Sequence, residues 1–338
     1  MWNIKKIYYF IRSKSKKLGN PFNRKSNRGR PYSLSPYEYA SSFILFTIFD
    51  FSLRDDEFIS DLLFGKHIDH NTFGKAFAKI SYIYIKKLLI LIRNEINNLI
   101  QEKPILIADS TGVIVDRMYF QTLNKCKIRK RRFYDKLSVL VEYYPANRTI
   151  TISDADSLFS SDSLSAKIML SEIETNADKF FADAGYDSNE LFEKLLMNKI
   201  VPIVRIKKRS GKLKKFRKVV REMFDDEEYK KYRSVIEGVF GGLENRRLLF
   251  TRYRKKSMRM KHIIAMAIVH NISTYMTISL FILIKSTNPI QCIMIVINSK
   301  KIDEGSSVSY SFFLDNKNCL AFRKMRGVYQ TGYPLSSF

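Results

Sequence analysis

Three acidic residues, far apart in the sequence, follow or lie within segments that favour regular structure. Asp109 comes directly after the apolar run Ile105–Ala108, a pattern typical of a strand buried on both faces. Asp183 follows a second short apolar run at 179–182, and Glu237 lies in a segment whose apolar residues have helical spacing. Taken alone, Asp109 is most simply a strand-end residue that starts a turn or caps local structure. The two later acids favour a shared chemical role instead.

Carboxylates grouped in this way suit the binding of hard divalent cations, which prefer oxygen ligands. Two Mg²⁺ ions about 4 Å apart can flank one phosphate, activating the attacking oxygen and stabilising the leaving one. A lone carboxylate binds Mg²⁺ weakly, so one shared aspartate plus one further acid for each ion is a sensible minimum. We therefore predict phosphodiester chemistry at Asp109, Asp183 and Glu237, with two Mg²⁺ ions as the cofactor and Mn²⁺ as a substitute.

An arginine accompanies the third acid. Arg233 precedes Glu237 by four residues, so the two side chains share one face of the expected helix. This arginine could orient the glutamate or bind a DNA phosphate through two hydrogen bonds. The alternative is a surface ion pair that contributes a few tenths of a kcal/mol.

The segment 104–206 contains the elements that would position the two aspartates. Its pattern predicts a strand ending at Asp109, a strand at 137–144, a return strand at 149–153, a helix at 163–173, a strand at 179–182, a helix at 189–197 and a strand at 200–206. This order resembles the ribonuclease H-like arrangement, in which the first and fourth strands are neighbours. Asp109 and Asp183 would then lie close together, although 183 − 109 = 74 residues separate them.

The predicted fold class is α/β, with a ribonuclease H-like mixed sheet flanked by helices and preceded by a helical domain. Ser35-Pro36-Tyr37-Glu38 has a cap residue, a first-turn proline and an early acid in the order that starts a helix. Short helices with tight turns suit a helix-turn-helix-like reader of DNA, and an ordinary helical bundle is the alternative. His67 and His70 lie close together in this part, but no cysteine supports a metal site there. The predicted parts are a basic arm at 1–32, a helical DNA-binding domain at 33–100, a catalytic domain at 101–285 and an extension at 286–338.

The chain has 338 residues and a formal net charge of +26, which would attract a polyanion. Nucleic acid is the first candidate partner and an anionic membrane surface the second. The segment 205–218 holds nine basic residues and no acid, so it is either a solvated loop or a track for a nucleic-acid backbone. The residues that we expect to contact DNA are Arg30, Lys207, Lys208, Arg209, Lys214, Lys215, Arg246 and Arg247.

Two further features bear on the class of protein. Cys126, Cys292 and Cys319 are scattered, form no CxxC pair and fit a reducing compartment. The segment 262–284 is apolar enough to raise a membrane span. Because polar residues interrupt it and no aromatic belt flanks it, we expect a core helix that covers the sheet.

Three motifs together resemble the DDE transposases of prokaryotic insertion sequences. They are Ala108-Asp109-Ser110-Thr111-Gly112, Ala182-Asp183-Ala184-Gly185-Tyr186-Asp187 and Arg233-Ser-Val-Ile-Glu237. The resemblance implies a ribonuclease H-like domain whose metal-binding triad is Asp109, Asp183 and Glu237, with Arg233 as the helix arginine. It also implies strand cleavage at the ends of a mobile element, strand transfer to target DNA, and a homodimer that brings two ends together in the nucleoid of the cytoplasm.

The chain departs from that family at two positions of the third motif. Lys230 stands where the family often has a tyrosine, and Glu244 stands where it often has a lysine. These departures affect accessory phosphate contacts more than the metal site. A catalytically inactive or nuclease-only descendant that keeps DNA binding is the alternative. The third hypothesis is a basic architectural or membrane-associated protein without catalysis.

Overall fold

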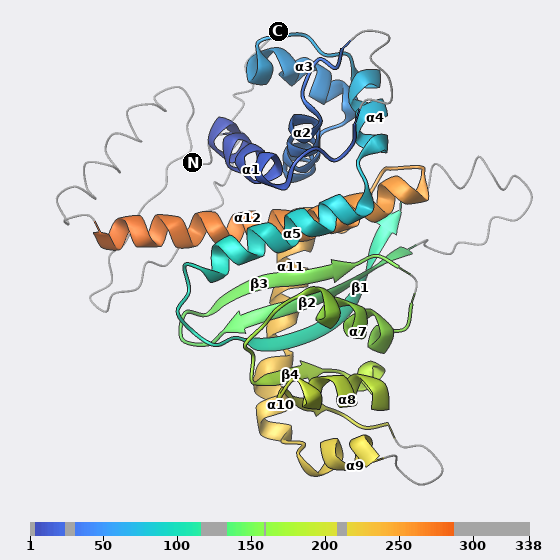
Figure 1. Ribbon diagram of the computed structural model, residues 1–338, viewed down its shortest axis with the longest axis vertical. Coiled ribbons are helices and arrows are strands. Elements are labelled where there is room, and N and C mark those ends of the chain that lie inside the picture. The colour runs from blue at the N-terminus through green and yellow to red at the C-terminus, as the bar shows by residue number, and fades with distance from the viewer. Residues whose placement is uncertain (1–3, 24–30, 116–133, 159, 208–214, 287–338) are drawn as a thin grey trace, which may run out of the picture. The chain divides into compact units, whose positions relative to one another are not determined.

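The computed structural model describes residues 4–23, 31–115, 134–158, 160–207 and 215–286. The chain divides into two compact units, 1–279 and 280–338, and the described part of the second is the end of a long helix. Figure 1 shows helices and a mixed sheet in the first unit. Of the predicted DNA-contacting residues, Arg30, Lys208, Arg209 and Lys214 lie outside the described residues.

One mixed sheet forms the centre of the first unit. Its strands are β1 (Ile105–Val115), β2 (Tyr134–Tyr144), β3 (Thr149–Asp156), β4 (Lys179–Ala182) and β5 (Val201–Val204), in the order β3-β2-β1-β4-β5. The pairs β1–β2 and β2–β3 are antiparallel, whereas β1–β4 and β4–β5 are parallel. The short β6 (Phe250–Thr251) pairs with the far end of β1. This is the predicted ribonuclease H-like arrangement, and the α/β fold class is confirmed.

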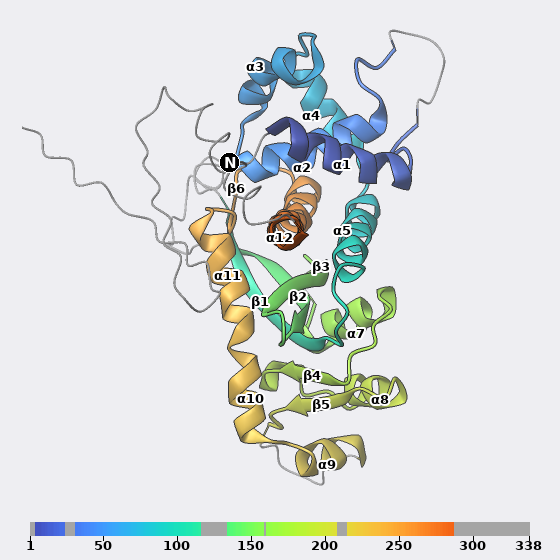
Figure 2. The ribbon, with the colours of Figure 1, turned by 90° about the vertical axis from the view of Figure 1, so that its left-hand side faces the viewer.

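The two faces of the sheet pack into separate cores because successive side chains of a strand point to opposite faces. On one face, Ile107, Val139 and Phe181 join a core shared with the N-terminal helices and with α11 (Val235–Asn245) and α12 (Lys256–Ser286). On the other face, Leu106 and Phe180 pack against α7 (Asp162–Glu172) and α8 (Asn189–Met197). Figure 2 shows α7 and α8 on one side of the strands and α11 on the other.

In the described residues before the sheet, the helices are α1 (Ile4–Leu18), α2 (Pro36–Phe49), α3 (Leu53–Phe64), α4 (His70–Lys79) and α5 (Tyr82–Asn97). Residues 4–18 of the predicted basic arm are thus helical. They bury Ile7, Tyr8 and Ile11, while Lys5, Lys6, Lys16 and Lys17 are exposed. The amphipathic spacing of these apolar residues explains the difference from an arm. The predicted helix start at Ser35 is confirmed, because Ser35 and Glu38 form a capping box.

Among the described residues, α12 is the helix that is long and apolar enough to cross a membrane by length and composition. Half of its most apolar window is buried inside the protein, and Ile263, Ile264 and Ile268 are fully buried. The Asn271 side chain accepts a hydrogen bond from Ile152 N of β3 and donates one to Ile152 O, both at 2.8 Å. These contacts agree with the prediction of a core helix that covers the sheet.

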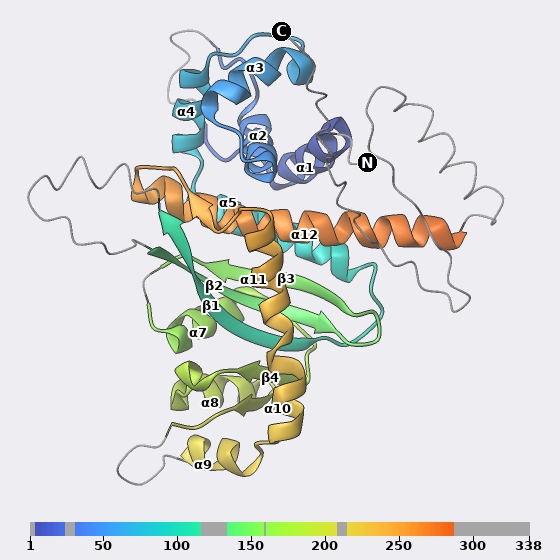
Figure 3. The same ribbon diagram turned by 180° about the vertical axis from the view of Figure 1, so that it is seen from behind.

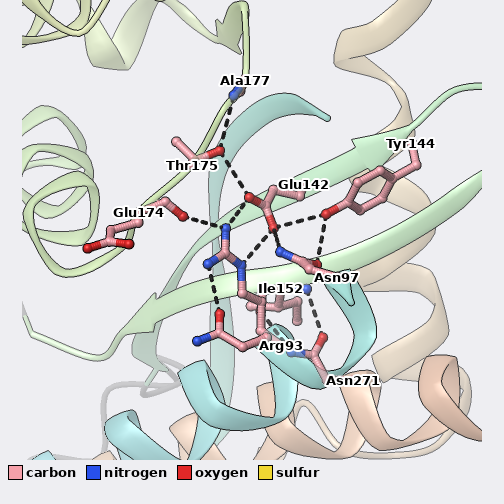
Figure 4. Close-up of polar contacts among 10 residues, drawn as sticks. Arg93, Asn97, Glu142, Tyr144, Ile152, Glu174, Thr175, Ala177 and Asn271 are labelled. Carbon is pink, nitrogen blue, oxygen red and sulfur yellow. Dashed lines mark hydrogen bonds and ion pairs between the residues drawn. The ribbon is translucent and has the colours of Figure 1, made fainter. Parts of the chain in front are cut away.

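A buried ion pair fastens α5 to the sheet (Figure 4). The side chains of Arg93 on α5 and Glu142 on β2 are 5% and 1% exposed. Arg93 Nε donates to Glu142 Oε2 at 2.8 Å, and its Nη2 donates to the other carboxylate oxygen and to the carbonyl of Glu174. Asn97 Nδ2 and Thr175 Oγ1 also donate to Glu142, each at 3.0 Å. The network therefore satisfies both charges and holds α5 against the strands that carry the site described below.

Asp56 of α3 is an acid buried in an apolar setting, with 1% of its surface exposed and no ion-pair partner among the described residues. Burial, and next the charge of Asp55, raise its pKa to about 8. In the unfolded chain that pKa is about 3.9. The stabilisation by the protonated carboxyl is therefore complete below about pH 4 and is lost as the pH rises through about 8.

We expect Asp56→Asn to gain stability over the unchanged protein as the pH rises from about 5 to about 8, by roughly 1.4 kcal/mol per pH unit. Urea unfolding of both proteins at the two pH values measures the difference between their free energies of unfolding. Asp55→Asn is the matched control. Its exposed carboxylate caps α3 by accepting a hydrogen bond from Ser52 N at 2.7 Å, and the pKa of Asp55 is lowered, so this variant should lose stability at neutral pH. If the difference between Asp56→Asn and the unchanged protein stayed constant with pH, the raised pKa of Asp56 would be contradicted.

Candidate active site

Asp109 lies within β1, and Asp183 directly follows the neighbouring strand β4. Strands β1 and β4 are parallel, and Ala108 is opposite Ala182. The next residue after each alanine is an aspartate, so Asp109 and Asp183 are neighbours. The prediction that the two acids lie close together rested on this pairing. One detail was wrong: β1 does not end at Asp109. It continues to Val115 because its second half pairs with β2 on one side and with β6 on the other, whereas β4 stops at Ala182.

Asp109 is partly buried and paired with Arg233. Its Oδ2 accepts a hydrogen bond from Arg233 Nη2 at 2.8 Å, and the two side chains are 17% and 19% exposed. Burial raises the pKa of Asp109, Arg233 opposes that rise, and the nearby charge of Asp183 adds to it, so the net pKa lies above the ordinary value. Arg233 Nε and Nη1 are buried and have no hydrogen-bond partner among the described residues, so the guanidinium keeps two unused donor nitrogens there.

Glu237 lies one helical turn beyond this arginine. Helix α10 (Asp226–Arg233) passes into α11 through Ser234, whose backbone is itself helical at φ −70° and ψ −18°. Figure 3 shows α10 and α11 following one another across the strands, and α10 contacts β4 while α11 contacts β1. Glu237 is exposed. The structure thus pairs Arg233 with Asp109 and leaves Glu237 on the same helical path, without bringing all three predicted acids within 4.8 Å of one another.

The second motif contains two aspartates with different surroundings. Asp183 accepts a hydrogen bond from Gly185 N at 2.7 Å, and in the part of the chain that the structure describes it has no ion-pair partner. Asp187 is buried and holds Arg217 through two bonds of 2.7 Å. Because Asp187 is committed to Arg217, Asp183 is the member of the motif that is available for chemistry.

A fourth acid lies in the same place, and the sequence reasoning missed it. Asp162 is the first residue of α7, and its Oδ1 accepts a hydrogen bond from Ser110 Oγ at 2.9 Å and lies 2.7 Å from Lys136 Nζ. A methyl group added at Gly185 would lie 2.8 Å from Asp183 Oδ1 and 3.0 Å from Asp162 Oδ2. One oxygen of each carboxylate therefore lies close to the position that a side chain at Gly185 would occupy. In the sequence, Asp162 resembles an ordinary first-turn acid, and only the packing of α7 on β1 shows its position.

The described basic residues of the predicted DNA track have different roles. Lys207, Lys215, Arg246 and Arg247 are exposed and remain candidates for DNA contact. Arg217, from the same basic run as Lys207, is 8% exposed and forms the buried pair with Asp187. Part of the run therefore stabilises the attachment of α9 (Lys215–Glu222) to the segment after β4.

A separate group of ligating atoms lies between α3 and α4. Three atoms that could bind a metal lie within 4.8 Å of one another there, one each from Glu57, Asp69 and His70. His70 Nδ1 lies 2.6 Å from Glu57 Oε2, and His67 Nε2 lies 3.1 Å from Glu57 Oε1. These imidazole–carboxylate pairs account for the grouping, and we assign no metal to it.

Three comparisons relate the chain to known proteins. The chain is 28% identical over 211 residues to an uncharacterised protein of Aquifex aeolicus (strain VF5), and this match covers 60% of the chain and 65% of that protein. Among solved structures, it is similar to a piggyBac transposase in a synaptic complex with hairpin DNA, at 10% identity and a TM-score of 0.39, covering 81% of this chain and 73% of that one. A family model described as a transposase DDE domain matches residues 100–272, which is more than half of the chain. The resemblance inferred from the three motifs is thus confirmed, and the chain belongs to the family of transposase DDE domains.

Proposed function

We propose that this protein is the transposase of an insertion sequence, which cuts DNA strands at the ends of its element and joins the freed ends to target DNA. The observation that carries the proposal is the placement of Asp109 and Asp183 on neighbouring strands with Arg233 bonded to Asp109. A protein that only binds DNA has no need of partly buried acids in this arrangement.

The donor set fits Mg²⁺. Asp109, Asp183 and Glu237 offer carboxylate oxygens, which hard divalent cations prefer, and no soft ligand takes part. Burial is the largest cause that raises the pKa of Asp109, and Asp183 adds to the rise while Arg233 opposes it, so negative charge at this place is disfavoured without a further cation. A divalent cation would supply the missing charge. When bound there, Mg²⁺ would activate the attacking oxygen and stabilise the leaving one.

The residues of the chain supply the positioning. In the first reaction, a water oxygen attacks the scissile phosphorus, and the bond to the 3′ oxygen of the element end breaks. In the second, that 3′-OH attacks a phosphodiester of the target, and a target 3′ oxygen leaves. The unused Nε and Nη1 donors of Arg233 are suited to a phosphate oxygen or to the carboxylate of Glu237 one turn away. The approach of Glu237 to the two aspartates would complete the triad.

DNA would be held by the other parts of the chain. We propose that the helices within 33–100 form the DNA-binding domain, that 101–285 is catalytic, and that exposed Lys207, Lys215, Arg246 and Arg247 follow the phosphate backbone. Two copies of the chain would bring two element ends together. The net charge of +26 predicts an affinity for DNA that falls steeply as salt rises.

The test is cleavage of DNA that carries the inverted repeats flanking the gene, with Mg²⁺ present and with EDTA in its place. We expect Glu237→Gln to lower strand cleavage about a hundredfold or more, because an isosteric amide keeps the shape and removes a metal-binding charge. Glu244→Gln is the matched control, since Glu244 is also an exposed acid of α11. It should change cleavage by less than about threefold.

Two results would contradict the proposal of an active transposase. Unchanged protein that binds the repeats in a salt-dependent manner but never cuts them would favour an inactive descendant. Protein without salt-dependent affinity for DNA would remove the proposal altogether.

A further inference from the structure

Asp162 has two oxygens in different surroundings. Its Oδ1 is used by Ser110 Oγ on β1 and by Lys136 Nζ on β2. Its Oδ2 and Asp183 Oδ1 both lie close to the position that a side chain at Gly185 would occupy. Like charges that converge on one point repel each other unless a cation lies near them.

The cations present do not balance these acids. Asp109 has Arg233 and Asp162 has Lys136, but the described residues give Asp183 no ion-pair partner. Three carboxylates thus share two basic partners in a protein whose net charge is +26. The sequence offers basic residues in abundance, so the local excess of negative charge is a specific property of this site.

A buried hydroxyl group, that of the residue after Gly185, is near enough to these charges for them to affect its pKa. Tyr186 is 1% exposed, and its hydroxyl has no hydrogen-bond partner in the described part of the chain. Burial first, and then the charges of Asp162, Asp109 and Asp183, raise the pKa of Tyr186. A buried polar group without a partner costs about 1–3 kcal/mol, so an unpaired hydroxyl beside three acids indicates that a further group binds there.

We propose that Asp162 is a fourth carboxylate of the divalent-cation site, acting together with Asp183, and that Lys136 occupies part of the cation's place when no cation is bound. This inference rests on the proposed function, because it assigns Asp162 to the same cation. Ser110 fixes the orientation of the carboxylate from the strand that carries Asp109. Gly185 has no side chain, and any larger residue at this position would meet both carboxylates.

Two substitutions separate a cation ligand from a structural contact. Asp162→Asn removes the charge and keeps the shape, so Mn²⁺ affinity should fall about tenfold or more. Lys136→Met removes the basic group that competes with the cation, so Mn²⁺ affinity should rise. If Asp162 only fastened α7 to the sheet through Lys136, both substitutions would weaken the same contact and change affinity in the same direction.

The measurement is titration of the full-length protein with Mn²⁺, followed by the electron paramagnetic resonance signal of the free ion. Unfolding curves of each variant check the fold. Asp109→Asn, run in parallel, tests the proposed function itself. If Asp109→Asn loses Mn²⁺ and Asp162→Asn keeps the affinity of the unchanged protein, the role of Asp162 is overturned while the proposed function stands. Unchanged or weaker binding by Lys136→Met would also overturn the inference, even if Asp162→Asn failed to fold. An unchanged protein that binds no Mn²⁺ would count against the proposed function first.

Discussion

Asp109→Asn should abolish Mg²⁺-dependent cleavage of element-end DNA and leave the affinity for that DNA almost unchanged. Asparagine fits the same space on β1 but offers one neutral oxygen where the aspartate offers a charge. Loss of a central metal ligand should reduce cleavage by about a thousandfold or more, since the reaction depends on charge stabilisation at the phosphate. Binding should persist because it depends on many basic residues and on a net charge of +26.

Asp178→Asn is the matched control for this prediction. Asp178 directly precedes β4, at the end opposite to Asp183, and forms an exposed ion pair with Lys103 in which both side chains are about two thirds exposed. Cleavage and binding should both remain near those of the unchanged protein, since exposed pairs contribute little. A nicking assay and a filter-binding assay on the same DNA measure the two properties. If Asp109→Asn lost DNA binding in parallel with cleavage, Asp109 would be a residue that supports the fold through Arg233.

The adjacency of Asp109 and Asp183 could be predicted because topology fixes it. Two antiparallel connections followed by a helical crossover return the chain beside its first strand, and the apolar runs mark where each strand lies. The exact extent of β1 could not be predicted, because residues 110–115 are polar or small at their start and pair with β2 and β6, which are remote in sequence. Long-range pairing overrode the local signal of a turn at Ser110-Thr111-Gly112.

Asp162 and Arg217 show a second limit of the sequence. Each belongs to a pattern with a common explanation, a first-turn acid in one case and a basic run in the other. The structure gives Asp162 a position beside Asp183 and gives Arg217 a buried pair with Asp187. Such roles depend on which elements pack together, and that information is absent from local composition. Glu237 is the reverse case, since its motif predicted its helix correctly but its approach to the aspartates remains a prediction.

Arg93→Met should destabilise the protein strongly, because it would leave the Glu142 charge buried without a cation. Glu142 is 1% exposed in side chain, and Arg93 supplies it with two hydrogen bonds. Breaking a buried pair from one side costs about 3–5 kcal/mol, a large share of the stability of a typical domain. The neighbours Asn97 and Thr175 would keep their bonds to Glu142, but neither carries a charge.

The double variant Arg93→Met with Glu142→Met should recover most of that loss, since replacing both charges by apolar groups removes the desolvation cost together with the attraction. Urea unfolding of the two single variants and the double variant forms a cycle that isolates the interaction. Lys103→Met, which breaks the exposed pair with Asp178, should cost less than about 1 kcal/mol and sets the scale. If Arg93→Met lost no more stability than Lys103→Met, water or a rearranged residue would be compensating the charge of Glu142. A large loss would instead show that α5 is held on the sheet by charge, so that the strand carrying Asp109 depends for its position on a pair that lies outside the site.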